Sequence, residues 1–379
     1  MNILINTSNL RTGGGLQVAE SICSLLPKYT DHHYVIALTD KLQHLNRVLS
    51  KYPNIKVLQY SQPLTIGRVL TGRDTYLDEI VSSMKINAVL TIFGPSRWRP
   101  KCFHLCGFAM PHIVFPESPY WKLLSLSSRL KSKIRIHLMK RDFRVNNDVL
   151  WCENESISYR LRIMFKDKEV YTITNNYHQI FDHSESWDKS IKLPTFNGLT
   201  LLTISANYPH KNLPIALAAL YKLRKLAPDV HVRFVFTIKE NQFPNIPLEF
   251  KGNFIFLGPI SISQCPPLYK QSDVMFQPSL LECFSATYAE AMRMKIPILT
   301  TDLDFAHSLC GDSAIYYKAT DPEDLAKCII ELFYDKNRVD ELIANGVSRL
   351  EQFDKVENRI EKLINIIEHK VSNNVNIQR

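Results

Sequence analysis

Three charged side chains in the second half of the chain lie where apolar runs give way to helical patterns. Lys211 follows such a run and directly precedes a helical pattern that Asn212 is expected to cap. Glu282 and Glu290 flank the start of another helical pattern, eight residues apart. An ammonium group beside a helix start can neutralise a diphosphate, and carboxylates accept hydrogen bonds from paired hydroxyls of a sugar or ribose. These side chains are therefore candidates for binding a phosphorylated sugar.

A glycine-rich turn near the N-terminus offers a second place for phosphate. Gly13, Gly14 and Gly15 separate the first apolar run from the first helical pattern. Glycines let the backbone approach a phosphate closely, and a helix N-terminus favours negative charge. The spacing is not G-x-G-x-x-G, because residue 18 is Val, which disfavours a dinucleotide-dependent dehydrogenase. The alternative is a flexible turn without a ligand.

The eight cysteines are scattered, and the only close group that they form is Cys102, His104 and Cys106. A zinc site would need further ligands at short spacing, and none follows. The alternation of the three side chains also suits one face of a buried strand. We therefore expect no metal at this position.

Short apolar runs alternate with helical patterns through most of the chain, which is typical of βαβ units and parallel sheets. The predicted strands of the first series are Asn2–Asn6, Tyr34–Leu38, Ile55–Leu58, Ala88–Phe93, Val149–Cys152 and Val170–Ile173. Those of the second series are Leu199–Ser205, His231–Thr237, Phe254–Leu257, Val274–Gln277 and Ile296–Leu299.

This pattern predicts an α/β protein with two Rossmann-like domains that face a cleft. The domains are expected at residues 1–183 and 199–355, joined by a polar linker at 184–198. A C-terminal helix at 356–379 is expected to pack back on the first domain. Ligands of such sheets bind at the carboxyl ends of the strands, which is where the candidate side chains lie.

The 379 residues carry a formal net charge of +9, which points to anionic partners. Between Trp121 and Arg144, eight basic residues stand against one acid, interspersed with leucine and isoleucine. Such a basic amphipathic segment suits an anionic membrane surface, and the alternative is an ordinary solvated helix. Nucleic acid is not expected, because no basic repeat with interleaved aromatic residues is present.

The N-terminus and the hydropathy pattern indicate a cytoplasmic protein. No apolar run approaches the roughly 18 residues of a membrane span. The first residues, Met-Asn-Ile-Leu-Ile-Asn, lack the charged and apolar regions of a signal peptide.

Five segments, in order, resemble the retaining glycosyltransferases of family 4, which have the GT-B fold. They are residues 13–15, 173–176, 204–212, 256–258 and 278–292, and the resemblance covers nearly the whole chain. The last segment, from Pro278-Ser279 to Glu290-Ala291-Met292, is similar to the family's Pro-Ser-x-x-Glu-Gly-Phe-Gly followed by Glu-Ala-Met.

The resemblance implies a role for each matching residue. Lys211 would bind the donor diphosphate, Glu282 the transferred sugar and Glu290 the ribose. Backbone amides near Phe284 and Ser285 would cradle phosphate. His112 follows a strand of the first domain and would face the transferred sugar, although a structural histidine is the alternative.

Two departures from the family's pattern concern this donor site. Ala206 stands where the family often has arginine, so one cation is missing unless Arg11 or His210 replaces it. Gly-Phe-Gly has become Cys283-Phe284-Ser285, whose side chains narrow the sugar pocket and leave the identity of the sugar open.

The implied activity is the transfer of a sugar, with retention, from a nucleoside diphosphate sugar as co-substrate. No metal and no further cofactor are expected. The expected acceptor is a lipid-linked bacterial surface glycan of the O-antigen, capsule or lipopolysaccharide type, at the cytoplasmic face of the inner membrane. The alternatives are a nucleotide-sugar epimerase of the same fold and a non-catalytic membrane-associated subunit.

Overall fold

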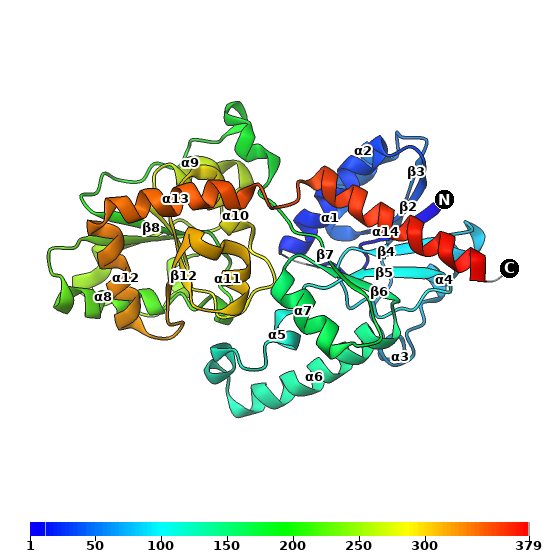
Figure 1. Cartoon of the computed structure of the whole chain (residues 1–379), viewed down its shortest axis with the longest axis horizontal. Coiled ribbons are helices and arrows are strands. Elements are labelled where there is room, and N and C mark those ends of the chain that lie inside the picture. The colour runs from blue at the N-terminus through cyan, green and yellow to red at the C-terminus, as the bar shows by residue number, and fades with distance from the viewer. Residues whose placement is uncertain (12, 378–379) are drawn as a thin grey trace. The chain divides into compact units, whose positions relative to one another are not determined.

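The chain folds into two compact units, each built around one parallel sheet (Figure 1). Unit 1 comprises residues 1–114 and 126–175 and the chain from Asp354 onward, and unit 2 comprises residues 115–125 and 176–353. The computed structural model describes residues 1–11 and 13–377, with the backbone alone for 374–377. Thr12 of the glycine-rich turn and residues 378–379 of the expected C-terminal helix lie outside the described residues.

The sheet of unit 1 has seven strands in the order β3-β2-β1-β4-β5-β6-β7, and all neighbouring pairs are parallel. The strands are β1 (Asn2–Asn6), β2 (His33–Thr39), β3 (Ile55–Tyr60), β4 (Ala88–Thr91), β5 (Phe103–Gly107), β6 (Val149–Cys152) and β7 (Val170–Thr172). β1 and β4 adjoin at the centre with Ile5 opposite Leu90. The strand order reverses between them, so their carboxyl ends mark the point where ligands of such sheets bind.

Helices surround this sheet. They are α1 (Gly14–Leu25), α2 (Asn46–Leu49), α3 (Ile66–Thr71), α4 (Thr75–Ser83), α5 (Pro111–Val114), α6 (Leu126–Val145), α7 (Glu155–Met164) and α14 (Val356–Ile377). Those with an apolar face, such as α1 and α4, bury that face in the core. The last helix returns to unit 1 and packs against α1 and β5 (Figure 1).

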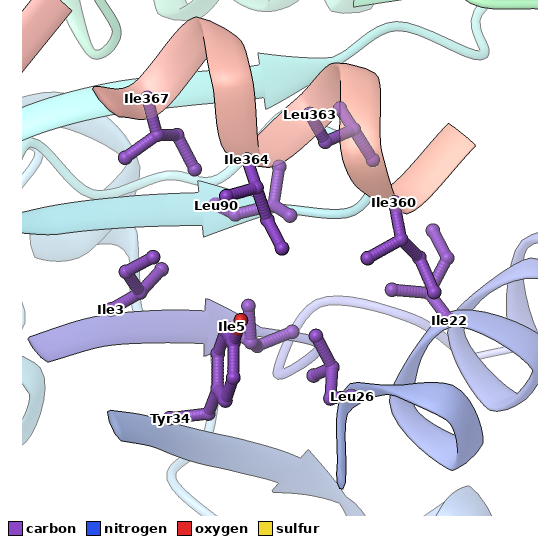
Figure 2. Close-up of a pocket in the computed structure, with 10 residues that line it drawn as sticks. All are labelled: Ile3, Ile5, Ile22, Leu26, Tyr34, Leu90, Ile360, Leu363, Ile364 and Ile367. Atoms are coloured by element: carbon purple, nitrogen blue, oxygen red, sulfur yellow. The ribbon is translucent and has the colours of Figure 1, made fainter. Parts of the chain in front are cut away.

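A small apolar cavity lies under α14 (Figure 2). Ten residues line it, from β1, β2, β4, the α1 region and α14: Ile3, Ile5, Ile22, Leu26, Tyr34, Leu90, Ile360, Leu363, Ile364 and Ile367. Its volume of about 10 Å³ leaves room for one water molecule at most. The cavity is therefore a packing defect of the core and not a substrate site.

The sheet of unit 2 has six parallel strands in the order β10-β9-β8-β11-β12-β13. The strands are β8 (Leu199–Thr203), β9 (Val232–Phe236), β10 (Phe254–Phe256), β11 (Val274–Gln277), β12 (Ile298–Thr301) and β13 (Ala314–Tyr317). Its helices are α8 (Ile215–Leu226), α9 (Cys265–Tyr269), α10 (Ala286–Met294), α11 (Asp304–Cys310), α12 (Pro322–Tyr334) and α13 (Lys336–Leu350). Strand order reverses between β8 and β11, whose carboxyl ends are the corresponding ligand-binding edge.

The predicted fold class, an α/β protein with two Rossmann-like domains, is confirmed. The cleft expected between the domains stays a prediction. The polar stretch at 184–198 does not stand free as a linker, because it is tied to unit 2: Asp188 N donates to Ser263 O at 3.0 Å, and Gln271 Nε2 donates to Ile191 O at 3.1 Å. Strands β5 and β13 were missing from the two predicted series, although the alternation of Cys102, His104 and Cys106 had suggested a buried strand where β5 lies.

Candidate functional site

Lys211 lies at the carboxyl end of β8 in a short 3-10 turn, Pro209–Lys211. The prediction that Asn212 caps the following helix was wrong. Asn212 adopts a left-handed conformation (φ 50°) that closes the turn, its side chain donates to Ala319 O at 3.3 Å, and α8 begins only at Ile215, after Pro214. Pro209 and Pro214 restrict the backbone to this turn and delay the helix. Lys211 therefore projects from a loop and not from a helix N-terminus.

Lys211 and Glu282 come together in an ion pair between Nζ and Oε1. The two residues are 71 positions apart and are joined because β8 and β11 are neighbours in the sheet. Only 13% of the lysine side chain and 11% of the glutamate side chain are exposed. The pair therefore places a cation and an anion, both largely shielded from water, at the ligand-binding edge of unit 2.

A buried polar network extends from this pair to the start of α10. Gln277, the last residue of β11, lies with Nε2 at 3.4 Å from Glu282 Oε1 and 3.2 Å from Ser285 Oγ. Ser285 Oγ also shares a hydrogen bond of 2.8 Å with Thr287 Oγ1. Sequence reasoning gave Gln277 no role, although a polar residue at the end of an otherwise apolar buried strand was a usable signal. Phe284 turns from this network and packs on Phe353, with ring centroids 5.7 Å apart.

Glu290 lies on α10 and is buried. Tyr269, at the end of α9, donates its hydroxyl hydrogen bond to Glu290 Oε2 at 2.9 Å. Burial raises the pKa of Glu290 to about 7, and the hydrogen bond from Tyr269 opposes this rise. This carboxyl titrates near neutrality and is held by one buried hydroxyl. In its ionised form the carboxyl can accept hydrogen bonds from the two hydroxyl groups of a diol. Tyr269 was not identified from the sequence.

An aromatic group covers the turn that carries Lys211. His210 stacks on Tyr208 with ring centroids 5.5 Å apart, and it meets Tyr120 edge-on with centroids 6.1 Å apart. Burial lowers the pKa of His210, so the ring is neutral at neutral pH and does not supply the cation missing at Ala206. The other suggested replacement, Arg11, is an exposed residue of unit 1.

Tyr120 belongs to residues 115–125, a segment that we call the strap. The strap leaves unit 1 after α5, packs on unit 2 and returns to unit 1 at α6. Ser118 Oγ donates to Leu280 O at 2.6 Å, and both residues are buried. Leu280 N in turn donates to His210 O at 2.7 Å. The strap thus fixes the loops that carry Lys211 and Glu282, a contact that sequence reasoning did not anticipate.

The remaining candidates lie in unit 1. Gly13 is the N-cap residue of α1 with φ 77°, a conformation that favours glycine. A Cβ added at Gly13 or Gly14 would meet no atom within 4 Å, so the backbone at this turn is open to an approaching group. His112 lies in α5, and its side chain is partly exposed. The phosphate-binding role of the turn, with Gly15, and the catalytic role of His112 stay predictions.

His104 takes part in a buried hydrogen-bond chain. Its ring nitrogens lie 2.8 Å from Thr91 Oγ1 and 2.6 Å from Asn146 O, and burial lowers its pKa to about 4. Cys106 is buried beside it on β5. Within residues 1–11 and 13–377, no group of three or more histidine, cysteine or acidic side chains is arranged to hold a metal ion.

Comparison with known proteins gives a family match for part of the chain and a fold match for nearly all of it. Residues 198–335, most of unit 2, match the family model described as Glycosyl transferases group 1. The whole chain is similar in fold to a glycosyltransferase from Rickettsia africae, with a TM-score of 0.68 and 15% identity over 97% of this chain and 98% of that one. It is also similar to Anabaena Alr3699/HepE in complex with UDP and glucose, with a TM-score of 0.62 and 13% identity over 97% and 100% of the chains.

Two curated relatives match over part of their length. The O-antigen chain mannosyltransferase RfbU of Salmonella typhimurium is 24% identical over 133 residues, 34% of this chain and 36% of that protein. The phosphatidyl-myo-inositol mannosyltransferase of Mycolicibacterium smegmatis is 27% identical over 149 residues, 38% and 39% of the two chains. The matches thus span little more than a third of each relative. Residues 198–335 thus match the group 1 glycosyltransferases, and the whole chain has the GT-B fold that the resemblance in its sequence implies.

Proposed function

We propose that the chain is a retaining glycosyltransferase that moves a sugar from a nucleoside diphosphate sugar to a hydroxyl group of a lipid-linked glycan. The observation that carries this proposal is the shielded Lys211–Glu282 pair at the carboxyl ends of β8 and β11, with buried Glu290 on the adjoining helix α10. Lys211 would bind the diphosphate, Glu282 would bind hydroxyls of the transferred sugar, and Glu290 would bind the ribose. The family match at residues 198–335 supports the same assignment.

In the proposed reaction, the bond between the anomeric carbon and the diphosphate oxygen breaks as the acceptor oxygen joins that carbon from the same face. The proton of the acceptor hydroxyl passes to the departing phosphate oxygen. Lys211 and the first N–H groups of α10 would stabilise the negative charge that develops on the diphosphate. No protein nucleophile and no metal is required by this scheme.

The acceptor side of the proposal rests on the curated relatives and on helix α6. One relative is named for the O-antigen chain and the other for phosphatidyl-myo-inositol, so a glycan or lipid hydroxyl is the acceptor to test first, and mannose is the first sugar.

Of the 20 residues of α6, only Asp142 and Phe143 are buried, while Leu126, Leu130 and Ile134 are 82%, 62% and 60% exposed. Among the described residues no helix is both apolar and long enough to cross a membrane. We propose that α6 holds the protein peripherally on the anionic cytoplasmic surface of the inner membrane.

The donor half of the proposal is tested with a panel of UDP, GDP, ADP and CDP, each alone and linked to glucose or mannose. A nucleotide at 100 times its dissociation constant should stabilise the protein by about 2.7 kcal/mol in thermal unfolding. Glu290→Ala should weaken binding of the bare nucleotide, whereas Glu282→Ala should spare it and reduce transfer. Equal loss of bare nucleotide binding in both variants would contradict the two assignments.

Product analysis separates the remaining candidates. Incubation of the matching nucleotide sugar with a lipid-linked acceptor should give a new glycoside with the anomeric configuration of the donor. A changed sugar on the nucleotide without an acceptor would identify an epimerase instead. Binding of no member of the panel would leave the non-catalytic subunit as the answer.

A further inference from the structure

The serine at the start of helix α10 does not cap its own helix. Ser285 occupies the N-cap position with φ −121° and ψ 117°, yet its side chain bonds none of the helix N–H groups. Its Oγ is engaged by Gln277 Nε2 at 3.2 Å and by Thr287 Oγ1 at 2.8 Å instead. An N-cap serine ordinarily accepts a hydrogen bond from the backbone N–H two or three residues later. The N–H of Tyr288 donates to Ser285 O at 3.2 Å, and the first two N–H groups of α10, those of Ala286 and Thr287, are left to another acceptor.

Gln277 is the residue that holds this hydroxyl. It is 1% exposed, and its Nε2 lies between Ser285 Oγ and Glu282 Oε1. A carboxylate only accepts hydrogen bonds, so the amide atom that faces Glu282 is the NH₂ group and the other is the oxygen. That oxygen, Oε1, is buried and has no hydrogen-bond partner among the described residues. Packing alone does not explain a buried amide in this state, because an unpaired buried oxygen destabilises the fold.

Unpaired polar atoms gather at the same edge of the sheet. In the described part of unit 2, four buried side-chain polar atoms have no partner, and three of them belong to Ser205, Gln277 and Ser279. These residues lie at or just after the ends of β8 and β11. Native proteins leave few such atoms unpaired, and those that remain often have a functional reason.

We propose that Gln277 is a positioning residue for donor binding, which rests on the proposed function of this site. By holding the hydroxyl of Ser285 away from the start of α10, Gln277 keeps the first backbone N–H groups of the helix open to the diphosphate. It also remains a hydrogen-bond donor to Glu282 after Lys211 turns from that carboxylate to the phosphates. One amide thus links the phosphate-binding and sugar-binding elements.

The test compares Gln277→Leu, Ser285→Ala and the double variant. In Gln277→Leu the serine hydroxyl is free to cap α10, so the melting temperature should rise by about 2 °C. The same cap competes with phosphate, so affinity for inorganic pyrophosphate, UDP and GDP should fall about tenfold in titration calorimetry. Ser285→Ala alone should keep pyrophosphate affinity within about twofold of the wild type.

The double variant provides the decisive comparison. Without the hydroxyl no cap can form, so adding Gln277→Leu to Ser285→Ala should change pyrophosphate affinity by less than about twofold. An equal tenfold loss in both backgrounds would overturn the proposal, and so would a Gln277→Leu variant with unchanged melting temperature and affinity. If Gln277→Leu does not fold, Gln277→Met makes the same comparison. Failure of the wild-type protein to bind pyrophosphate and every nucleotide of the panel would instead refute the proposed function.

Discussion

Lys211 and Glu282 form an ion pair, which a donor bound as proposed would separate. Lys211→Ala removes the cation that we propose to face the diphosphate, and we expect turnover to fall by about 100-fold, the scale at which single donors to a developing oxyanion act. The variant also leaves a shielded carboxylate unpaired, which lowers stability. Steady-state kinetics with a saturating acceptor measure the first effect.

A double variant separates the two effects of this substitution. Lys211→Ala combined with Glu282→Gln removes the unpaired charge, so the melting temperature should return toward that of the wild type while transfer stays lost. Full transfer activity in Lys211→Ala would mean that the diphosphate is held elsewhere.

The titration of Glu290 predicts a pH dependence of nucleotide binding. Burial raises its pKa to about 7, so the carboxyl is largely protonated at pH 6 and largely ionised at pH 8. Tyr269 and Cys265 face it from α9, and neither is ionised in this range because burial raises both of their pKa values. The neighbouring cation on α10, Arg293, is paired with Asp182. Bare nucleotide should bind more tightly as pH rises through about 7, and Glu290→Gln should remove that part of the dependence, as calorimetry at several pH values would measure.

The charged residues of the site were predictable because their chemistry is visible in their type and their place after a strand. Lys211 and Glu282 meet in the structure as this placement implies. Gln277 and Tyr269 were not predictable in the same way. The fold of the loop after β11 brings Glu282 to Gln277, and the packing of α9 on α10 brings Glu290 to Tyr269. An amide or a hydroxyl has many structural uses, and its sequence context does not select among them.

At the scale of elements, the strap is the part that sequence reasoning missed. Ser118 Oγ donates to Leu280 O and also accepts from Tyr120 N at 3.2 Å, so one hydroxyl both anchors and caps the segment. Ser118→Ala should destabilise the protein by about 2 kcal/mol, because it leaves a buried carbonyl unpaired and removes a cap. Urea unfolding should show this loss, and Ser186→Ala, an exposed serine in another 3-10 turn, is the matched control. Equal stability of the two variants would contradict the anchoring role.

Helix α6 leads directly from the strap and carries much of the charge of the chain. The stretch from Trp121 to Arg144 holds eight basic residues and one acid, and so supplies seven of the nine net positive charges. Replacing the exposed Lys131, Lys133 and Arg135 with Gln should weaken flotation with anionic vesicles, since each cation near the surface contributes about 1 kcal/mol. High salt should have the same effect.

The control for α6 is the same loss of charge elsewhere. The control variant replaces three exposed lysines of unit 2 with Gln: Lys225, Lys251 and Lys336. Its flotation with vesicles should stay close to that of the wild type. Nucleotide affinity should be unchanged in both triple variants. Vesicle binding that ignores salt and both sets of substitutions would leave α6 as an ordinary solvated helix.

The elements that were predicted well are the buried parallel strands. β1, β6 and β11 have the predicted bounds because their apolar runs end at polar or turn residues. β13 (Ala-Ile-Tyr-Tyr) was missed although it is as long as β6 and β11, because two of its four residues are tyrosines and the run is less apolar. The late start of α8 was missed because the left-handed Asn212 was interpreted as a helix cap.

On the scale of the whole molecule, the chain ends in the unit where it began. Arg359 of α14 is 1% exposed and donates to Glu153 Oε1 at 2.8 Å and to Asn175 Oδ1 at 2.6 Å. Thr174, beside Asn175, is bonded to Asp354 through its backbone N–H and its hydroxyl, both at 3.0 Å. Two of the four places where the chain passes between the units, at residues 175–176 and 353–354, are thus fixed to unit 1 by polar contacts.

This arrangement predicts that α14 controls the stability of unit 1 alone. Arg359→Met leaves Glu153 buried without its cation, and loss of one partner of a buried pair costs about 3–5 kcal/mol. Two units with separate cores should give two thermal transitions. The transition whose midpoint temperature rises when a nucleoside diphosphate binds belongs to unit 2. Arg359→Met should lower the other transition. Lys362→Met, one turn along α14, is the control. Lys362 is paired with Asp354, and its side chain is 52% exposed. Exposed pairs of this kind contribute at most about 1 kcal/mol to stability.

The effect of Arg359→Met should also depend on pH, in a direction set by Glu153. Burial raises the pKa of this carboxyl from 4.5 to about 7, and Arg359 opposes this rise. Between these two pH values the folded chain holds a proton on Glu153 that the unfolded chain has lost. The stability contributed by that proton is complete below the unfolded pKa and is lost as pH rises through about 7. Without the arginine the carboxyl must stay neutral, so the loss in Arg359→Met should be small near pH 5 and grow toward pH 8. Adding Glu153→Gln should remove this pH dependence. A loss of equal size at both pH values, measured by calorimetry on the unit 1 transition, would show that Arg359 stabilises unit 1 by packing and not by charge.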